Sequence, residues 1–218
     1  MNFIGNNCKI DESVQLGDNV TICDNTIIRK NVIIGNNVTI EENCIIGETP
    51  TVWGVDDVNS DVWDRKLIIE DNVNIKCFTV IERGANGYGS IIGEGTGIGS
   101  HCYFGHDAIV GKHNLIMPYV FFCGGVVTGE RVLIFSHVTV FNNVTIGNKT
   151  KVFHGANVFS STKNNDFIIG ENGDTLKEYC KKKNFLKCSS KTLQRIKDLE
   201  DTINGKDCRE HQETVQQG

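Results

Sequence analysis

Residues 14–49 read VQLGDN VTICDN TIIRKN VIIGNN VTIEEN CIIGET, six hexads with one shared pattern. The same frame starts at residue 8 and resumes after two interruptions, which gives 22 hexads in residues 8–49, 67–84 and 90–161. The third slot is apolar in 21 of these 22 hexads, and Thr128 is the exception. Because only 39% of the chain is apolar, so regular a match indicates an internal repeat with a period of six residues.

Each hexad combines a short strand with a tight turn. Slots one and three are mostly Val, Ile, Thr or Cys and slot two is often polar, which is the alternation of a β-strand. Slots four to six hold turn residues, and Gly fills slot four nine times, where we expect a positive φ to cost little. A three-residue strand cannot bury its own apolar edge, so the hexads must stack on one another. A helix is a poor alternative, because a period of six keeps no single stripe on a helix of about 3.6 residues per turn.

The repeat resembles that of the hexapeptide-repeat acyltransferases over about residues 3–161. The resemblance implies an all-β solenoid: a left-handed parallel β-helix with three hexads to a coil, usually assembled as a homotrimer. We therefore expect a β-helix over residues 1–161, with loops at residues 49–66 and 85–89. A short C-terminal α-helical segment and a disordered tail should follow over residues 162–218.

Composition restricts the partners and the compartment of the protein. The net charge of −5 argues against a nucleic-acid partner, since no basic cluster is large enough to neutralise phosphates. No apolar run nears the length of a membrane span, and Met1 leads almost directly into the repeat, without room for a signal peptide. The nine cysteines show no recurring CxxC spacing, so neither a disulfide framework nor a zinc site is expected. A cytoplasmic protein is the resulting expectation.

If three hexads make a coil, every third hexad falls at the same corner, with stacked residues about 4.8 Å apart. Both interruptions leave the repeat from the corner of His106, and so does the C-terminal segment. Loops that gather at one edge of a solenoid beside a histidine are a means of building a pocket. We therefore expect the active site at the corner of His106. The residues stacked at this corner are Glu12, Lys30, Glu48, Arg83, His106, Gly124, Asn142 and Ser160.

The long loop contains Trp53, Trp63 and four aspartates. One interpretation is a surface loop whose tryptophans pack on a neighbour. The other is a substrate lid, in which aromatic rings contact a base or sugar and carboxylates bind its hydroxyls. The sequence leaves both open.

A narrower resemblance is to the UDP-N-acetylglucosamine O-acyltransferases of lipid A assembly. It rests on DVNSD (57–61), IERG (81–84), GHDAIVG (105–111) and CGG (123–125). The resemblance implies that His106 is the general base, that Asp107 supports it, and that the Gly124 N–H binds the tetrahedral intermediate. It also implies that Asp61 contacts the sugar. The HD pair and the next-coil glycine occur as well in acetyl-CoA-dependent sugar N-acetyltransferases of this fold.

Other residues are expected to contact substrate, and four positions differ from the lipid A family. We expect Trp63, Arg83 and Tyr103 to contact substrate, and Asn142 to hydrogen-bond the pantetheine arm of the donor. The lipid A family has histidines at four nearby positions, where this chain has Glu82, Tyr103, Gly125 and Phe141. These departures leave the acceptor and the acyl chain length open.

The sequence thus predicts an acyltransferase without a tightly bound cofactor or metal. It would transfer an acyl group from acyl-CoA or an acyl carrier protein to an amine or hydroxyl of a nucleotide-linked sugar, with a histidine of near-neutral pKa as base. The alternative is an authentic UDP-N-acetylglucosamine 3-O-acyltransferase of lipid A biosynthesis. A third possibility is a γ-class carbonic anhydrase-like protein, suggested by the spacing of His101 and His106, or a structural β-helix subunit.

The C-terminal segment changes to a charged composition. Residues 176–187 are compatible with a short basic helix, and residues 189–205 place Leu193, Ile196, Leu199 and Ile203 on one helical stripe. The expectation is packing against the β-helix or around a trimer axis. Lys181 to Lys183 could alternatively contact CoA phosphates or an acidic carrier protein.

Overall fold

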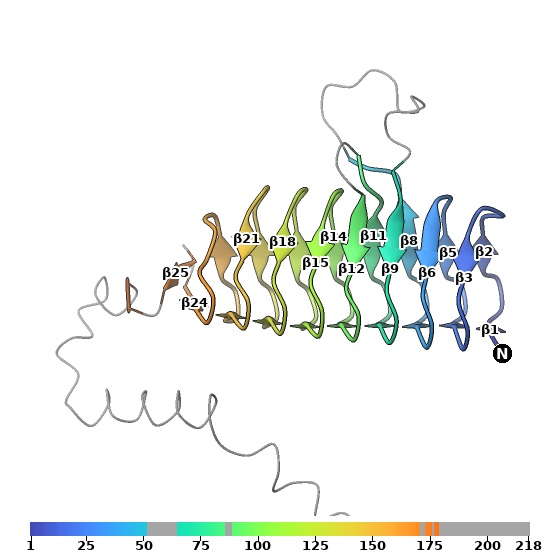
Figure 1. Cartoon of the computed structure of the whole chain (residues 1–218), viewed down its shortest axis with the longest axis horizontal. Coiled ribbons are helices and arrows are strands. Elements are labelled where there is room, and N and C mark those ends of the chain that lie inside the picture. Colours follow the sequence, from blue (N-terminus) through green and yellow to red (C-terminus); the bar gives the residue numbers. More distant parts are fainter. Residues whose placement is uncertain (52–64, 86–88, 171–172, 176, 179–218) are drawn as a thin grey trace, which may run out of the picture. The chain divides into compact units, whose positions relative to one another are not determined.

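The structure is a computed structural model that describes residues 1–51, 65–85, 89–170, 173–175 and 177–178. Within these residues the chain passes through three sheets of mainly parallel strands in turn and then returns to the first, one coil further along (Figure 1). This is the left-handed β-helix that the resemblance to the hexapeptide-repeat acyltransferases implies. No helix among the described residues is both long and apolar enough to span a membrane.

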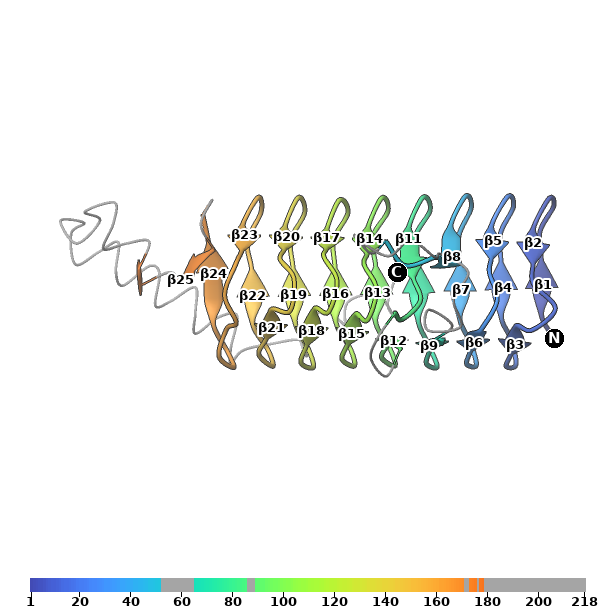
Figure 2. The same cartoon turned by 90° about the horizontal axis from the view of Figure 1, so that it is seen from above.

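We call the three sheets A, B and C, and they lie along the three sides of the helix (Figure 2). In the described residues, sheet A contains β1 (Phe3–Ile4), β4 (Thr21–Ile22), β7 (Thr39–Ile40), β10 (Asn74–Ile75), β13 (Gly97–Ile98), β16 (Leu115–Ile116), β19 (Leu133–Ile134), β22 (Lys151–Val152), β24 (Phe167–Ile169) and β25 (Asp174–Thr175). Sheet B contains β2 (Lys9–Ile10), β5 (Ile27–Ile28), β8 (Ile45–Glu48), β11 (Val80–Glu82), β14 (Tyr103–Phe104), β17 (Phe121–Phe122), β20 (Thr139–Val140) and β23 (Asn157–Val158). Sheet C contains β3 (Gln15–Leu16), β6 (Val32–Ile34), β9 (Leu67–Ile69), β12 (Ser90–Ile92), β15 (Ile109–Val110), β18 (Val127–Thr128) and β21 (Thr145–Ile146).

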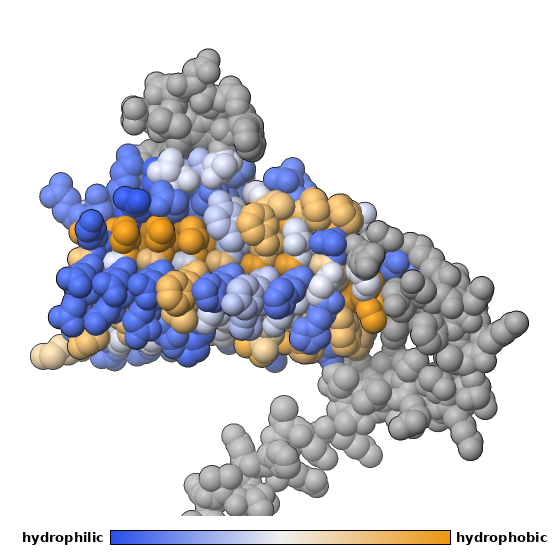
Figure 3. All heavy atoms as spheres, turned by 180° about the vertical axis from the view of Figure 1, so that it is seen from behind, coloured by the Kyte–Doolittle hydropathy of each residue, from blue (hydrophilic) through white to orange (hydrophobic). Residues whose placement is uncertain are grey.

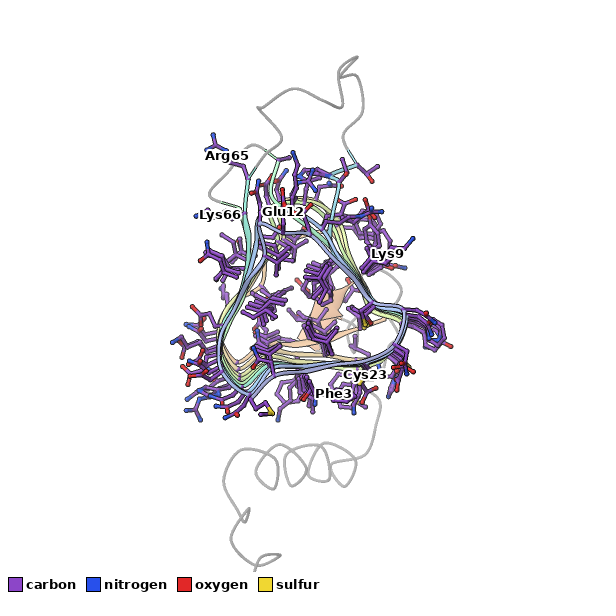
Figure 4. All side chains as sticks on the ribbon, turned by 90° about the vertical axis from the view of Figure 1, so that its right-hand side faces the viewer. Phe3, Lys9, Glu12, Cys23, Arg65 and Lys66 are labelled. Atoms are coloured by element: carbon purple, nitrogen blue, oxygen red, sulfur yellow. The ribbon has the colours of Figure 1, made fainter. Side chains whose placement is uncertain are left out.

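The register of the sheets follows the repeat. Strands β14 and β17 pair in parallel with Tyr103 opposite Phe121, a separation of one uninterrupted coil. Three hexads to a coil are therefore confirmed. Viewed along the axis, the coils superpose as a triangle, with Glu12 at one corner and Arg65 and Lys66 beside it (Figure 4). Both interruptions leave from this corner, between a sheet B strand and the following sheet C strand, and we call it the B–C corner.

The core is the interior of this triangle, which slots one and three fill. Its largest fully buried side chains include Phe104 and Phe122, which meet edge to face with their ring centroids 5.0 Å apart. Thr128, the polar exception in slot three, is buried as well. Its hydroxyl accepts a hydrogen bond of 2.7 Å from Nδ2 of buried Asn114. The break in the apolar pattern is thus a paired polar group, which removes the cost of burying it alone.

The turns differ from expectation in which slot has the positive φ. Positive φ falls in slot six, where Asn19, Asn25 and Asn37 have values of 55–59°. Of the nine slot-four glycines, Gly47 alone has a positive φ. Individual slot-four positions instead require glycine for space: a Cβ on Gly111 would lie 2.4 Å from the carbonyl oxygen of Gly129 on the next coil.

The stack of strands continues beyond the expected boundary at residue 161. Strand β24 pairs in parallel with β22, and β25 turns back to pair antiparallel with β24. The compact unit that contains the β-helix accordingly runs from Met1 to Leu176. Of the expected C-terminal helices, only residues 177–178 are described as helical, and the rest lies outside the described residues.

Aromatic rings form an exposed row at the corner between sheets A and B. Phe78, His101, Tyr119 and His137 occupy slot six of successive coils, and their rings stack with centroids 4.8–4.9 Å apart. The outer face of sheet B also carries an apolar band, visible in orange in Figure 3. Two of the exposed apolar side chains of sheet B and its turns are Phe121 and Phe159.

Candidate active site

A pocket of about 290 Å³ opens at the B–C corner, where β11, β14, β17 and β20 end. Four of the expected site residues line it: Tyr103, His106, Gly124 and Asn142. They come from three successive coils, because His106, Gly124 and Asn142 occupy slot five of every third hexad. The remaining lining residues are Thr51, Glu82, Gly105, Phe121 and Cys123.

His106 and Asp107 form a pair in the turn between β14 and β15. Nδ1 of the imidazole lies 2.9 Å from Oδ2 of Asp107. The other carboxylate oxygen accepts the backbone N–H of Ala85 at 3.0 Å, which fixes the orientation of the carboxylate. Asp107 has a φ of 57°, a conformation that Asp tolerates better than most residues and that directs consecutive side chains toward each other here.

The pair sets the tautomer and the basicity of His106. A carboxylate can only accept, so Nδ1 carries the proton and Nε2 keeps its lone pair. The hydrogen bond with Asp107 raises the pKa of His106 above its usual value, while burial acts in the opposite direction. Nε2 is therefore a base whose conjugate acid is stabilised by a neighbouring charge.

Gly124 lies directly against the imidazole. A Cβ built on Gly124 would be 2.5 Å from Nε2 and 2.6 Å from Cε1 of His106, so only glycine leaves room for the ring. Among the described residues, no group accepts a hydrogen bond from the Gly124 N–H. The base and this backbone donor therefore belong to residues that line the same pocket.

Glu82, which sequence reasoning noted only as a departure, is central to the pocket wall. The whole residue is 1% exposed. Oε2 accepts the backbone N–H of His106 at 2.8 Å, and Oε1 accepts the hydroxyl of Tyr103. Oε1 also accepts the N–H and the hydroxyl of Thr51, at 3.1 and 2.7 Å.

Of the other three expected contacts, Arg83 belongs to the described residues. Arg83 is buried and does not line the pocket; its Nη1 donates to the carbonyl of Gly47 at 3.0 Å. Asp61 and Trp63 lie outside the described residues.

Sequence reasoning missed Thr51, Phe121 and Cys123 as lining residues. Phe121 follows from the repeat, because it stacks on Tyr103 one coil away with the ring centroids 4.7 Å apart. Cys123 was predictable in the same way, because it lies one coil beyond Gly105, the neighbour of His106. Thr51 belongs to an interruption with no repeat, so no sequence signal pointed to it.

The spacing of His101 and His106 produces no shared site within the chain. His101 stacks between Phe78 and Tyr119 at the corner of sheets A and B, whereas His106 lies at the B–C corner. In the described part of the chain, no three His, Cys, Asp or Glu side chains gather as a metal site requires. As the hexad count indicates, a zinc site that uses both histidines would have to bridge two subunits.

Comparisons with known proteins agree with the class that the coils define, the hexapeptide-repeat left-handed β-helix. Residues 3–35 match the sequence model of the bacterial transferase hexapeptide (six repeats). No curated protein sequence matches the chain.

The particular solved structures that the chain is similar to include three UDP-N-acetylglucosamine acyltransferases. The enzyme from Francisella novicida is 20% identical with a TM-score of 0.62, over 89% of this chain and 77% of that one. The enzyme from Moraxella catarrhalis is 21% identical with a TM-score of 0.59, over 93% and 82% of the two chains. The Arabidopsis enzyme is 16% identical with a TM-score of 0.64, over 93% and 79%. At these identities the similarity is one of fold.

Proposed function

We propose that this protein is an acyltransferase that transfers an acyl group from a thioester to an amine or hydroxyl of a nucleotide-linked sugar. The donor is acyl-CoA or an acyl carrier protein, and no tightly bound cofactor takes part. Such donors agree with the cytoplasmic location expected from the sequence. The observation that carries this proposal is the His106–Asp107 pair beside the available N–H of Gly124.

These groups match the needs of acyl transfer. Nε2 of His106 takes a proton from the acceptor as its nitrogen or oxygen forms a bond to the thioester carbonyl carbon. The carbonyl electrons move to oxygen, and the Gly124 N–H stabilises the resulting oxyanion. Collapse breaks the carbon–sulfur bond, and the thiolate takes the proton from the imidazolium, which Asp107 has stabilised.

We also propose that the chain assembles as a homotrimer, with the neighbouring subunit forming the facing wall of each pocket. Phe121 lines the pocket and is 43% exposed, and Phe159, two coils further, is 54% exposed. Large apolar side chains left in water beside a site are typical of an interface.

The direct test is His106→Ala in the purified protein. UDP- and dTDP-sugars, UDP-N-acetylglucosamine among them, are assayed with acetyl-CoA and acyl carrier thioesters. We expect transfer with at least one pair, and a loss of about 10²–10⁴-fold in the variant. His137→Asn, at an exposed histidine of another corner, is the matched control and should retain activity. Unchanged turnover in His106→Ala would exclude the assigned base.

A further inference from the structure

Glu82 makes more hydrogen bonds than its structural position requires. It occupies slot four, and its Oε2 caps the slot-five N–H of the next coil, that of His106, at 2.8 Å. Glu70 provides a comparison on the same fold, because its Oε2 caps the slot-five N–H of Glu94 at 2.9 Å. Glu70 is 37% exposed in its side chain, whereas Glu82 is 1% exposed as a residue. Capping the turn therefore accounts for Oε2 of Glu82 but not for the burial and bonding of Oε1.

Oε1 of Glu82 determines which way the Tyr103 hydroxyl points. A phenol has one proton to donate and two lone pairs. The Tyr103 proton is directed to Oε1, which as a carboxylate oxygen can only accept. Burial, followed by the bond to Glu82, raises the pKa of Tyr103 to about 12, so the phenol keeps its proton at neutral pH. A hydrogen bond from Thr51 acts in the opposite direction on this pKa and can occupy one of the two lone pairs, so one lone pair remains on the Tyr103 oxygen for the pocket.

The pocket thus has two hydrogen-bond acceptors on one coil. Nε2 of His106 has its lone pair because the Nδ1–H donates its hydrogen bond to Asp107, and Tyr103 has its own because its hydroxyl donates to Glu82. Both residues line the same pocket. A hydroxyl carries one proton and can satisfy only one of them, whereas a neutral primary amine carries two.

We propose that Glu82 is a positioning residue that makes the site select a primary amine, rather than a hydroxyl, on the nucleotide-linked sugar. This inference rests on the proposed function and names its acceptor. One amine proton is donated to Tyr103 and the other to His106, which leaves the nitrogen lone pair for the thioester carbonyl carbon. As the carbon–nitrogen bond forms, His106 removes its proton and passes it to the departing thiolate, so the products are an amide and a thiol.

The test compares nucleotide-linked hexoses in matched pairs that differ only in an amine or a hydroxyl at one ring carbon. The measured quantity is the ratio of kcat/KM for the amine to that for the hydroxyl. An amine is intrinsically the better nucleophile, so the ratio in the native protein decides nothing. We expect Tyr103→Phe to lower the ratio by about 2- to 12-fold, the effect of one hydrogen bond. Tyr119→Phe removes a tyrosine hydroxyl at another corner and should leave the ratio unchanged.

Glu82→Gln tests whether Glu82 acts through Tyr103. A glutamine that keeps its carbonyl on the His106 N–H presents its NH₂ to the phenol, which then turns its own proton toward the pocket. The ratio should fall by a similar factor with Tyr103 present and should not change further in the Tyr103→Phe background. Glu70→Gln, with the same capping bond, is the structural control, and thermal unfolding of each variant checks folding.

The outcomes separate the two proposals. A ratio unaffected by Tyr103→Phe overturns the amine selection while leaving acyl transfer intact. If Glu82→Gln lowers the amine-to-hydroxyl ratio equally in the native and the Tyr103→Phe backgrounds, Glu82 does not act through Tyr103. Loss of the His106 requirement, or no transfer to any pair, instead overturns the proposed function.

Discussion

Two neighbours hold the imidazole of His106 from different sides. Asp107 bonds to Nδ1, and Gly124 leaves the space that the ring occupies next to Nε2. The carboxylate of Asp107 is itself fixed by the N–H of Ala85, at the start of the second interruption. The orientation of the base therefore depends on three backbone segments that are distant in sequence.

The first prediction concerns the pH dependence of Asp107→Asn. Asn tolerates the positive φ of this position, so the turn should fold. Asp107 is the largest cause of the raised pKa of His106, and its loss should lower that pKa. The base acts when neutral, so the acid limb of the pH–rate profile should move to lower pH. The maximal rate should nevertheless fall about 10²-fold or more, since the tautomer is no longer fixed.

Initial rates across the pH range give this measurement. Asp24→Asn, at a turn of another corner, is the control and should leave the profile in place. An acid limb that keeps its position in Asp107→Asn would show that His106 does not titrate in the rate-limiting step.

At the residue scale, the repeat predicted which side chains share a corner but not how they bond. Counting hexads placed His106, Gly124 and Asn142 in one column, because stacking is a matter of register. The bonds of Glu82 were not predictable, since they join a slot-four side chain to Tyr103 and to Thr51, which lies outside the repeat.

At the scale of the strands, slot one carries a ladder of polar side chains inside the core. The hydroxyl of Thr96 donates to the carbonyl of Gly111 and accepts the N–H of Asn114 on the next coil. Asn114 repeats both bonds, donating to Gly129 at 3.0 Å and accepting the N–H of Val132 at 2.7 Å. Its second amide hydrogen is the one that reaches Thr128.

The second prediction follows from this ladder. Asn114→Val should lower the free energy of unfolding by about 1–3 kcal/mol, because it leaves buried groups without partners. Asn114→Thr should recover most of that loss, since a threonine can make the two bonds that Thr96 makes. Chemical denaturation of the purified variants measures both. Equal stability of the valine and threonine variants would contradict the role of the ladder.

The turns show what the sequence pattern could and could not predict about the elements. Frequent slot-four glycines suggested positive φ there, whereas slot six has it, and the asparagines of that slot were the available signal. Glycine is common for two reasons, conformational freedom and lack of volume, and composition does not separate them. Strand β24 was missed because residues 162–166 break the hexad frame.

At the scale of the whole molecule, the repeat predicts the packing of the interior but not the apolar side chains exposed on the outer surface. Apolar side chains in slots one and three fill the triangle, as a period of six requires. Leu115, Tyr119, Phe121 and Phe159 are nonetheless large, apolar and exposed. Sequence periodicity cannot identify what covers them, because these positions lie on the outside of the coil whether or not a second chain is present.

The third prediction is that the purified chain sediments as a homotrimer. Burial of the exposed apolar side chains of sheets A and B should hold the subunits together. Sedimentation equilibrium at several concentrations should give three times the mass of the chain. A mass of one chain that still supports acyl transfer would mean that a single subunit forms the complete site.

The coil of three hexads also limits how this protein can change in length. Strand partners such as Tyr103 and Phe121 are eighteen residues apart. Removal of eighteen residues therefore deletes one coil and leaves the stacked residues of the remaining coils aligned. Removal of a single hexad between His106 and Gly124 would rotate the glycine to a different edge and dismantle the site without harming the core. Evolution and engineering can therefore shorten or extend this β-helix only by whole coils, or through loops that leave and rejoin it at a corner.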